Sequence, residues 1–234
     1  MNSYIELKNV SKKFGNKTVL RNICLSVPKG ETVGVIGSNG SGKSVLFKII
    51  SGFLKADSGE VYIRGKKLGE KTDFSENMGV FINSPGFVDI YTGFQNLKYL
   101  AAIRGEIGDV QIIDAMNKVG FDYRDKTKVK GYSLGMKQKL GIAQAFMENQ
   151  EILLLDEPFN ALDFQTYKEI RNVIHDLKNA GKTILLISHN YTDIEKLCDR
   201  IYVIKNGHLT PATEEIIMEY KIANGEIRSG SEER

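Results

Sequence analysis

Long apolar runs, clustered charge and paired cysteines are all missing from this sequence of 234 residues. No apolar run approaches the roughly 18 residues that a helix needs to cross a bilayer, and the N-terminus lacks the apolar core of a signal peptide. We therefore expect a chain that does not cross a membrane by itself. Its two cysteines, Cys24 and Cys198, fit neither a metal-binding spacing nor a secreted disulfide framework, which favours a reducing compartment.

The distribution of charge argues against a nucleic-acid partner. The 32 basic and 29 acidic residues give a net charge of +3, and the basic residues are spread along the chain. A nucleic-acid-binding surface would show them clustered on one face. Hydrophobic residues make up 41% of the chain, which is enough to bury a core. The length suits one large domain or a domain with an inserted lobe.

What the sequence does contain is a glycine-rich stretch between a short apolar run, residues 32–36, and a helical pattern over residues 45–50. The stretch consists of Gly37, Ser38, Asn39, Gly40, Ser41, Gly42, Lys43 and Ser44. Strand, Gly-x4-Gly-Lys-Ser and helix in that order is the context of a phosphate-binding loop. The glycines let backbone N–H groups point inward at a helix N-terminus, where they cradle phosphate oxygens.

Two side chains of this loop have expected roles in the site. Lys43 would meet the β- and γ-phosphates, and the Ser44 hydroxyl would hold Mg²⁺. The alternative is a plain turn between a strand and a helix. The correctly placed flanking elements favour the phosphate loop, so we expect a nucleoside triphosphate site.

A second nucleotide-site signal lies in the second half of the chain. Residues 152–155 form a buried-strand run, and Asp156 and Glu157 follow at its C-terminal end. Parallel sheets bind ligands at that edge, so Asp156 could hold Mg²⁺ and Glu157 could orient or deprotonate a water. His189 follows another buried strand, residues 183–187. A lone histidine is usually structural or on the surface, but this position favours a place at the same edge.

The remaining pattern predicts a strand-rich lobe and a helical lobe. Residues 5–10 and 18–27 alternate apolar and polar, as half-buried strands do. Phe14 lies between them and is either a core residue at a strand end or an exposed ring that stacks on a purine base. From about residue 84 to 149 the pattern is helical between two strands of one sheet, which indicates an inserted lobe. Within it, Ser133 is placed to cap a helix.

With these pieces in line, the chain resembles the ATPase subunit of an ABC transporter. The resemblance covers Ile5 to about Leu209 and rests on an ordered set of motifs. The matched positions are residues 37–44 for the Walker A loop, 152–156 for the Walker B strand, Glu157 for the catalytic glutamate, Phe14 for the adenine-stacking aromatic, 132–136 for the signature motif, 160–163 for the D-loop and His189 for the switch histidine.

The resemblance implies an α/β fold: a P-loop NTPase core with an N-terminal antiparallel β lobe and an inserted helical lobe. It implies one domain over residues 1–234, with residues 84–149 as the helical lobe and 211–234 as a C-terminal tail. The implied cofactors are ATP and Mg²⁺. The implied partners are a transmembrane permease and a second ATPase subunit, identical or not, arranged head to tail. This places the chain at the cytoplasmic face of the cell membrane.

The roles implied for individual residues follow the family's mechanism. ATP on the Walker A loop of one subunit is covered by Ser133 and Gly135 of the other, and the D-loop residue Asp163 joins the site. Glu157 acts on the attacking water. The γ-phosphate is held by Lys43, Mg²⁺ and His189. Closure of the dimer would pass to the permease through the helical lobe.

This sequence departs from the family at several positions. The signature is commonly Leu-Ser-Gly-Gly-Gln, whereas Leu134 replaces the first glycine and Met136 the glutamine. The Q-loop glutamine, expected at Mg²⁺ or the attacking water, is Asn83, which is shorter by one methylene. The D-loop carries Ala161 where glycine is usual. The signature, and the residues after Asn83, are similar to antibiotic- and multidrug-efflux ATPase subunits, which implies an exporter.

Two other functions are open from the sequence alone. A soluble ATPase of the same fold could act on DNA or ribosomes, but such relatives carry a long coiled coil or two ATPase domains in tandem. A GTP-binding switch protein would want an Asn-Lys-x-Asp motif, which the sequence lacks. For the transporter, apolar residues at the start of the helical lobe are either its core or a groove for a permease helix. They are Phe87, Val88, Ile90, Tyr91 and Phe94.

Overall fold

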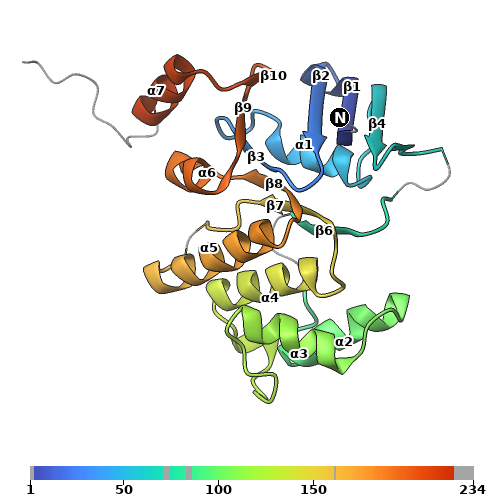
Figure 1. Ribbon diagram of the computed structural model, residues 1–234, viewed down its shortest axis with the longest axis vertical. Coiled ribbons are helices and arrows are strands. Elements are labelled where there is room, and N and C mark those ends of the chain that lie inside the picture. The colour runs from blue at the N-terminus through green and yellow to red at the C-terminus, as the bar shows by residue number, and fades with distance from the viewer. Residues whose placement is uncertain (1–2, 71–73, 83–85, 161, 224–234) are drawn as a thin grey trace, which may run out of the picture.

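The computed structural model describes residues 3–70, 74–82, 86–160 and 162–223, in which two β-sheets and several helices stack in layers (Figure 1). The sheet at the N-terminus is antiparallel, with strand order β2-β1-β4-β5. In β2 the buried residues Ile23, Leu25 and Val27 alternate with exposed ones, so one face meets the core, as predicted. The strands are β1 (Ser3–Phe14), β2 (Lys17–Pro28), β4 (Ser58–Ile63) and β5 (Lys66–Lys67).

The second sheet carries the nucleotide-site motifs and has the order β10-β9-β3-β8-β7-β6. It is parallel from β9 to β6, and β10 pairs antiparallel with β9. Every residue of β3, β7 and β8 is buried, which explains their continuous apolar sequences. The strands are β3 (Thr32–Ile36), β6 (Met78–Phe81), β7 (Ile152–Asp156), β8 (Thr183–Ile187), β9 (Arg200–Lys205) and β10 (His208–Pro211).

Alternate residues of the parallel strands serve two separate cores. Ile152 and Leu154 face the core shared with α1 and the antiparallel sheet, whereas Leu153 and Leu155 face the core shared with α4 and α5. The strands thus lie between two apolar layers. In Figure 1, α2, α3 and α4 lie together on the side of the parallel strands away from the antiparallel sheet. The helices are α1 (Lys43–Ile50), α2 (Gly93–Arg104), α3 (Asp109–Lys118), α4 (Leu134–Phe146), α5 (Phe164–Asn179), α6 (Tyr191–Leu197) and α7 (Glu214–Ala223), with a 3₁₀ turn at Val129–Gly131.

The predicted fold class is confirmed, with a few short elements that the sequence pattern did not predict. Ser133 caps α4 as expected, since its Oγ accepts a hydrogen bond from the Met136 N–H at 3.2 Å. The unpredicted elements are α6, β5 and β10, each short enough to lack a clear periodicity. The boundaries proposed for the helical lobe, residues 84–149, stay a prediction. No helix in the described part of the chain has the length and apolar character that spanning a bilayer requires.

Strand β6 and helix α4 pack with their backbones in contact at Gly79. A Cβ added there would lie 1.7 Å from the Ala145 carbonyl oxygen, which belongs to α4. Only glycine fits this contact, because the obstacle is backbone and cannot rotate away. Helix α4 is thereby held directly against β6, the strand that precedes residue 83.

Gly79→Ala should destabilise the protein because the added methyl forces α4 away from β6. Overpacking of this kind costs about 1–3 kcal/mol, and contact with backbone favours the upper end. Urea denaturation would show a lower midpoint with an unchanged slope. Gly131→Ala is the matched control, since its Cβ would come no closer than 3.6 Å to a neighbour. A parental midpoint for Gly79→Ala would contradict the close packing.

Candidate functional site

The phosphate-binding loop connects β3 to α1, as the motif predicts. Gly42 is the N-cap of α1 with a φ of 110°, a left-handed conformation that disfavours any side chain. A Cβ at Gly42 would also lie 3.0 Å from Leu20 and 3.1 Å from Val19, both on β2. The glycine therefore lets the loop turn into the helix while it lies against the antiparallel sheet. This brings the first turn of α1 beside the hairpin that carries Phe14.

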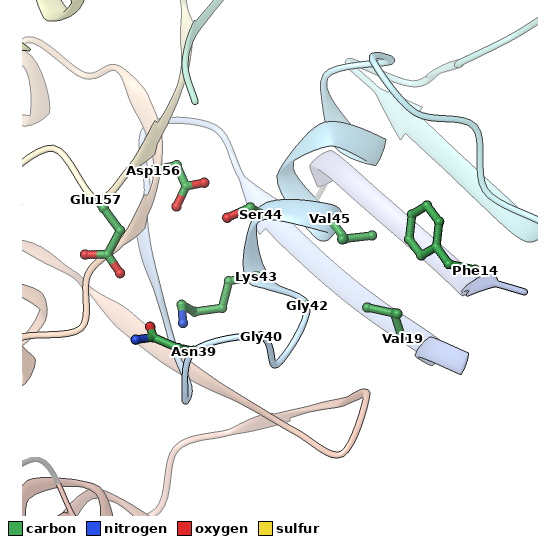
Figure 2. Close-up of a pocket in the computed structure, with 10 residues that line it drawn as sticks. All are labelled: Phe14, Val19, Asn39, Gly40, Gly42, Lys43, Ser44, Val45, Asp156 and Glu157. Carbon is green, nitrogen blue, oxygen red and sulfur yellow. The ribbon is translucent and has the colours of Figure 1, made fainter. Parts of the chain in front are cut away.

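A pocket of about 320 Å³ opens over this loop (Figure 2). The two carboxylates lie at one end and Phe14 at the other, with Lys43 between them. The Phe14 side chain is 49% exposed, so the core interpretation of this residue is wrong. The residues that line the pocket are Phe14, Val19, Asn39, Gly40, Gly42, Lys43, Ser44, Val45, Asp156 and Glu157.

Two opposite charges are buried at the phosphate end of the pocket. Lys43 is 7% exposed and its Nζ donates to the carbonyl oxygens of Gly37 at 2.6 Å and Ser38 at 3.1 Å. Burial lowers the pKa of Lys43, and the nearby Glu157 and Asp156 oppose that shift. Burial raises the pKa of Asp156, which is 5% exposed, while the Ser44 hydroxyl lowers it and Glu157 raises it further. Burial is the largest influence on both pKa values, and the attraction between Lys43 and the carboxylates offsets it only in part.

The residues present fit a magnesium ion. The Asp156 Oδ1 atom is buried without a hydrogen-bond partner in the described structure, and such an oxygen is a hard ligand that suits Mg²⁺. The Ser44 hydroxyl is the neighbouring oxygen. Among the described residues no cluster of three or more His, Cys, Asp or Glu side chains could hold a metal alone. A Mg²⁺ bound jointly by one or two protein ligands and by phosphates needs no such cluster.

Glu157 and His189 form a pair beside the pocket. Glu157 has a φ of 53°, and its N–H donates to the Ile187 carbonyl at the end of β8, at 2.9 Å. Its Oε2 atom accepts from the His189 N–H at 3.1 Å and lies 2.8 Å from His189 Nδ1. A left-handed conformation is costly for a glutamate and is typical of functional sites. The backbone turn therefore aims the carboxylate at both the pocket and the histidine.

Several predicted site residues lie outside this pocket. Ser133 is exposed at the start of α4, and Gly135 packs near Thr166 and Leu162. Both carboxylate oxygens of Asp163 accept from Thr166, at 2.9 Å from its N–H and 2.6 Å from its hydroxyl, and this lowers the Asp163 pKa. Asp163 thus caps α5. Asn83 is outside the described residues. One chain therefore brings together the phosphate-binding loop, Asp156, Glu157 and His189, but not Ser133 and Gly135.

Three residues that line the pocket or support its neighbourhood were not predicted from the sequence. Val19 and Val45 line the apolar side of the pocket near Phe14, and only the position of Val45 next to Ser44 signals such a role. Gln138, buried on α4, donates from Nε2 to the Asn160 carbonyl at 2.9 Å. Asn160 in turn donates its N–H to the Glu157 carbonyl at 3.2 Å. Gln138 thus joins α4 to the segment that follows Glu157.

Glu157→Gln should abolish turnover while nucleotide binding is kept. The amide keeps the shape of the side chain but cannot take a proton from the attacking water, and loss of a general base costs roughly 10²- to 10⁴-fold in rate. Phosphate-release assays measure turnover, and equilibrium titration with ATP measures binding. Glu106→Gln, on an exposed turn between α2 and α3, is the control and should leave both unchanged. Parental turnover in Glu157→Gln would rule out this residue as the base.

Phe14→Ala should weaken ATP and GTP binding to a similar degree, because stacking tolerates any base. Stacking of a base on an aromatic ring is worth roughly 1–3 kcal/mol. Competition titrations with both nucleotides decide the matter. Tyr99→Ala is the control, since this exposed ring on α2 lies outside the pocket. An unchanged affinity in Phe14→Ala would show that the ring does not touch the base.

Comparison with known proteins gives consistent matches. The model of the ABC transporter family matches residues 20–160. A lantibiotic transport ATP-binding protein of Streptococcus pyogenes is 34% identical over 205 residues, which cover 88% of this chain and 88% of that protein. A bacitracin transport ATP-binding protein of Enterococcus faecalis is 39% identical over 218 residues, which cover 89% and 68%.

A similar solved structure is a dimeric ATP-binding cassette in a post-hydrolysis state, bound to ADP and Pi. It superposes with a TM-score of 0.78 at 26% identity over 89% of this chain and 98% of that one. A nucleotide-free cassette superposes with a TM-score of 0.79 at 25% identity over 94% and 95%. The pocket, the ordered motifs and these matches lead to one conclusion: the chain belongs to the ABC transporter family as an ATP-binding, ATP-hydrolysing subunit.

Proposed function

We propose that this ATPase works in a head-to-tail pair of cassettes and powers the export of an antibiotic through a separate membrane-spanning permease. The observation that carries the proposal is the division of the site. The Walker A loop, Asp156 and Glu157 line one pocket, whereas Ser133 and Gly135 lie outside it. Because these two residues are suited to a phosphate but do not line the pocket of their own chain, a second chain is needed to use them. A related cassette of known structure is described as a dimer.

In this arrangement each residue of the nucleotide site has a defined role. The loop N–H groups and Lys43 bind the phosphates, and the Lys43 charge gains strength because the site is buried. Ser44 and Asp156 would hold Mg²⁺, which neutralises phosphate charge when it is bound. Glu157 takes the proton of the attacking water. His189, which follows the C-terminal end of β8, holds the Glu157 carboxylate in place.

The direction of transport is proposed from the relatives. Similar proteins are named for lantibiotic transport, bacitracin transport and linearmycin resistance. This agrees with the efflux-type signature at residues 132–136. The matching family and relatives are transporter subunits, so action on DNA or ribosomes is set aside.

We place the chain at the cytoplasmic face of the cell membrane, docked to the permease through the start of the helical lobe. Of the five residues predicted for this contact, Phe87 and Phe94 pack against the core. Val88 is 44% exposed and Ile90 65% exposed. The half-buried Tyr91 ring lies 6.4 Å from the exposed ring of Tyr99 on α2. Val88, Ile90, Tyr91 and Tyr99 form the surface that we call the docking patch.

Hydrogen bonds anchor the backbone of the docking patch at Val88 and Tyr91. The Val88 N–H donates to Asn96 Oδ1 at 2.8 Å, and the Asn96 amide donates back to the Val88 carbonyl at 3.2 Å. The Val129 N–H donates to the Tyr91 carbonyl at 2.9 Å. A pre-organised apolar surface loses little conformational entropy when a partner helix binds to it. This supports a short permease helix as the occupant.

Ile90→Glu should release the chain from membranes and leave its basal ATPase activity nearly unchanged. The substitution buries a charge under the permease helix without touching the nucleotide pocket. Cells that express both chains are fractionated, and the purified variant is assayed for ATP hydrolysis. The control is Val110→Glu on α3, which is 77% exposed and outside the docking patch. An Ile90→Glu chain that still sediments with membranes would contradict the docking patch.

A further inference from the structure

The C-terminal helix α7 contacts the residue that holds the catalytic carboxylate. The Tyr220 hydroxyl donates to the His189 carbonyl oxygen at 3.1 Å. The two residues are far apart in the sequence, and α7 lies at the periphery near α6 and β10 (Figure 1). None of the sequence motifs named above lies in α7. This contact places one of its side chains two hydrogen bonds from Glu157.

Several side-chain contacts attach helix α7 to α6 and to the core. Ile216, Ile217 and Tyr220 pack against the core that contains Ile194 and Leu197 of α6. Lys221 places its Nζ 4.4 Å from the centre of the Tyr191 ring and 3.6 Å from Glu195 Oε1. Apolar contact, a cation–π contact and an ion pair thus join α7 to α6. These contacts fix where the Tyr220 hydroxyl lies.

His189 has hydrogen-bond partners in two separate parts of the fold. Toward the pocket, its N–H and its Nδ1 atom both meet Glu157 Oε2, at 3.1 Å and 2.8 Å. Its carbonyl oxygen accepts a hydrogen bond from the Tyr220 hydroxyl of α7. The neighbours of His189 are held by the loop and by the first turn of α6, because the Asn190 N–H donates to Ser188 Oγ at 3.1 Å and Ser188 Oγ donates to Asp193 of α6 at 3.3 Å. The His189 carbonyl, by contrast, accepts its hydrogen bond from Tyr220 of α7.

We propose that Tyr220 is a positioning residue, through which α7 orients the His189 backbone and so sets the placement of the Glu157 carboxylate in the nucleotide pocket. The inference rests on the proposed roles of Glu157 and His189. Tyr220 touches no reacting atom. Its effect passes through Glu157, so it changes the chemical step and not nucleotide binding. Displacement of α7 would leave the Walker A loop intact while it loosens the histidine that holds the carboxylate. The C-terminal helix is therefore a point at which a partner could tune the rate of hydrolysis.

The test is Tyr220→Phe in the full-length chain, which removes one hydroxyl and keeps the ring that packs on the core. Loss of a single hydrogen bond predicts a fall in kcat of about 3- to 10-fold, with the KM for ATP changed by less than about two-fold. Tyr62→Phe is the matched control, because its hydroxyl bonds Glu60 on the antiparallel sheet, away from the pocket. It should leave both constants at parental values.

A spectroscopic readout separates positioning from stability. The chain has three histidines, His175, His189 and His208, so their ring ¹⁵N resonances are resolvable after selective labelling. Tyr220→Phe should move the His189 ring signals because the Glu157 contact changes, while His175 on α5 stays as an internal reference. A purely structural role would lower the melting temperature and leave the His189 environment in the folded state unchanged.

The outcomes are distinguishable from failure of the proposed function. If Glu157→Gln is inactive while Tyr220→Phe keeps the parental kcat or the parental His189 signals, the positioning role is overturned and the proposed function stands. If Glu157→Gln still turns over, the proposed function fails first and the positioning role fails with it. A Tyr220→Phe chain whose kcat and melting temperature both fall, and whose KM for ATP changes as well, would also overturn the inference. Lower kcat, unchanged KM and shifted His189 signals would support it.

Discussion

The site depends on a buried carboxylate and a buried ammonium at one edge of a parallel sheet. Asp156 is 5% exposed and Lys43 is 7% exposed, and one Asp156 oxygen has no hydrogen-bond partner within the described structure. Burial acts against the charged form of both groups. A phosphate chain with its cation would satisfy both groups at once, because it supplies negative charge to Lys43 and positive charge to Asp156. The cost of burying these two groups is thus offset when a nucleotide and its cation bind.

Strand order explains why these groups meet. β8 lies between β3 and β7, so the loop after β8 emerges between the phosphate-binding loop and the Asp156–Glu157 pair. His189 is carried on that middle loop and reaches Glu157. On the far side of β7, β6 packs backbone to backbone on α4, and Gln138 ties α4 to Asn160. Helix α4 is therefore joined both to β6 and to the segment after Glu157.

Sequence patterns predict the parts of this structure that are governed by local chemistry. The strands at 32–36 and 183–187 are continuous apolar runs because both faces are buried, and Ser133 is a capping residue in an ordinary position. Longer-range contacts carry no such signal. The left-handed conformation of Glu157, which turns it toward His189, and the Tyr220 contact both arise from tertiary packing. The segment before α2 is irregular and has no hydrophobic periodicity. The sequence therefore does not predict that Phe87 packs against the core while Ile90 is exposed.

The central claim is that a second chain completes the nucleotide site through Ser133. Light scattering of Glu157→Gln at increasing concentration, with ATP and Mg²⁺, measures it most directly. The account predicts a nucleotide-dependent dimer, because hydrolysis no longer reopens the pair. Adding Ser133→Arg to the same chain should restore the monomer mass while ATP still binds, since Ser133 lies outside the pocket of its own chain. A Glu157→Gln chain that stays monomeric with ATP bound, or a double variant that still dimerises, would contradict the account.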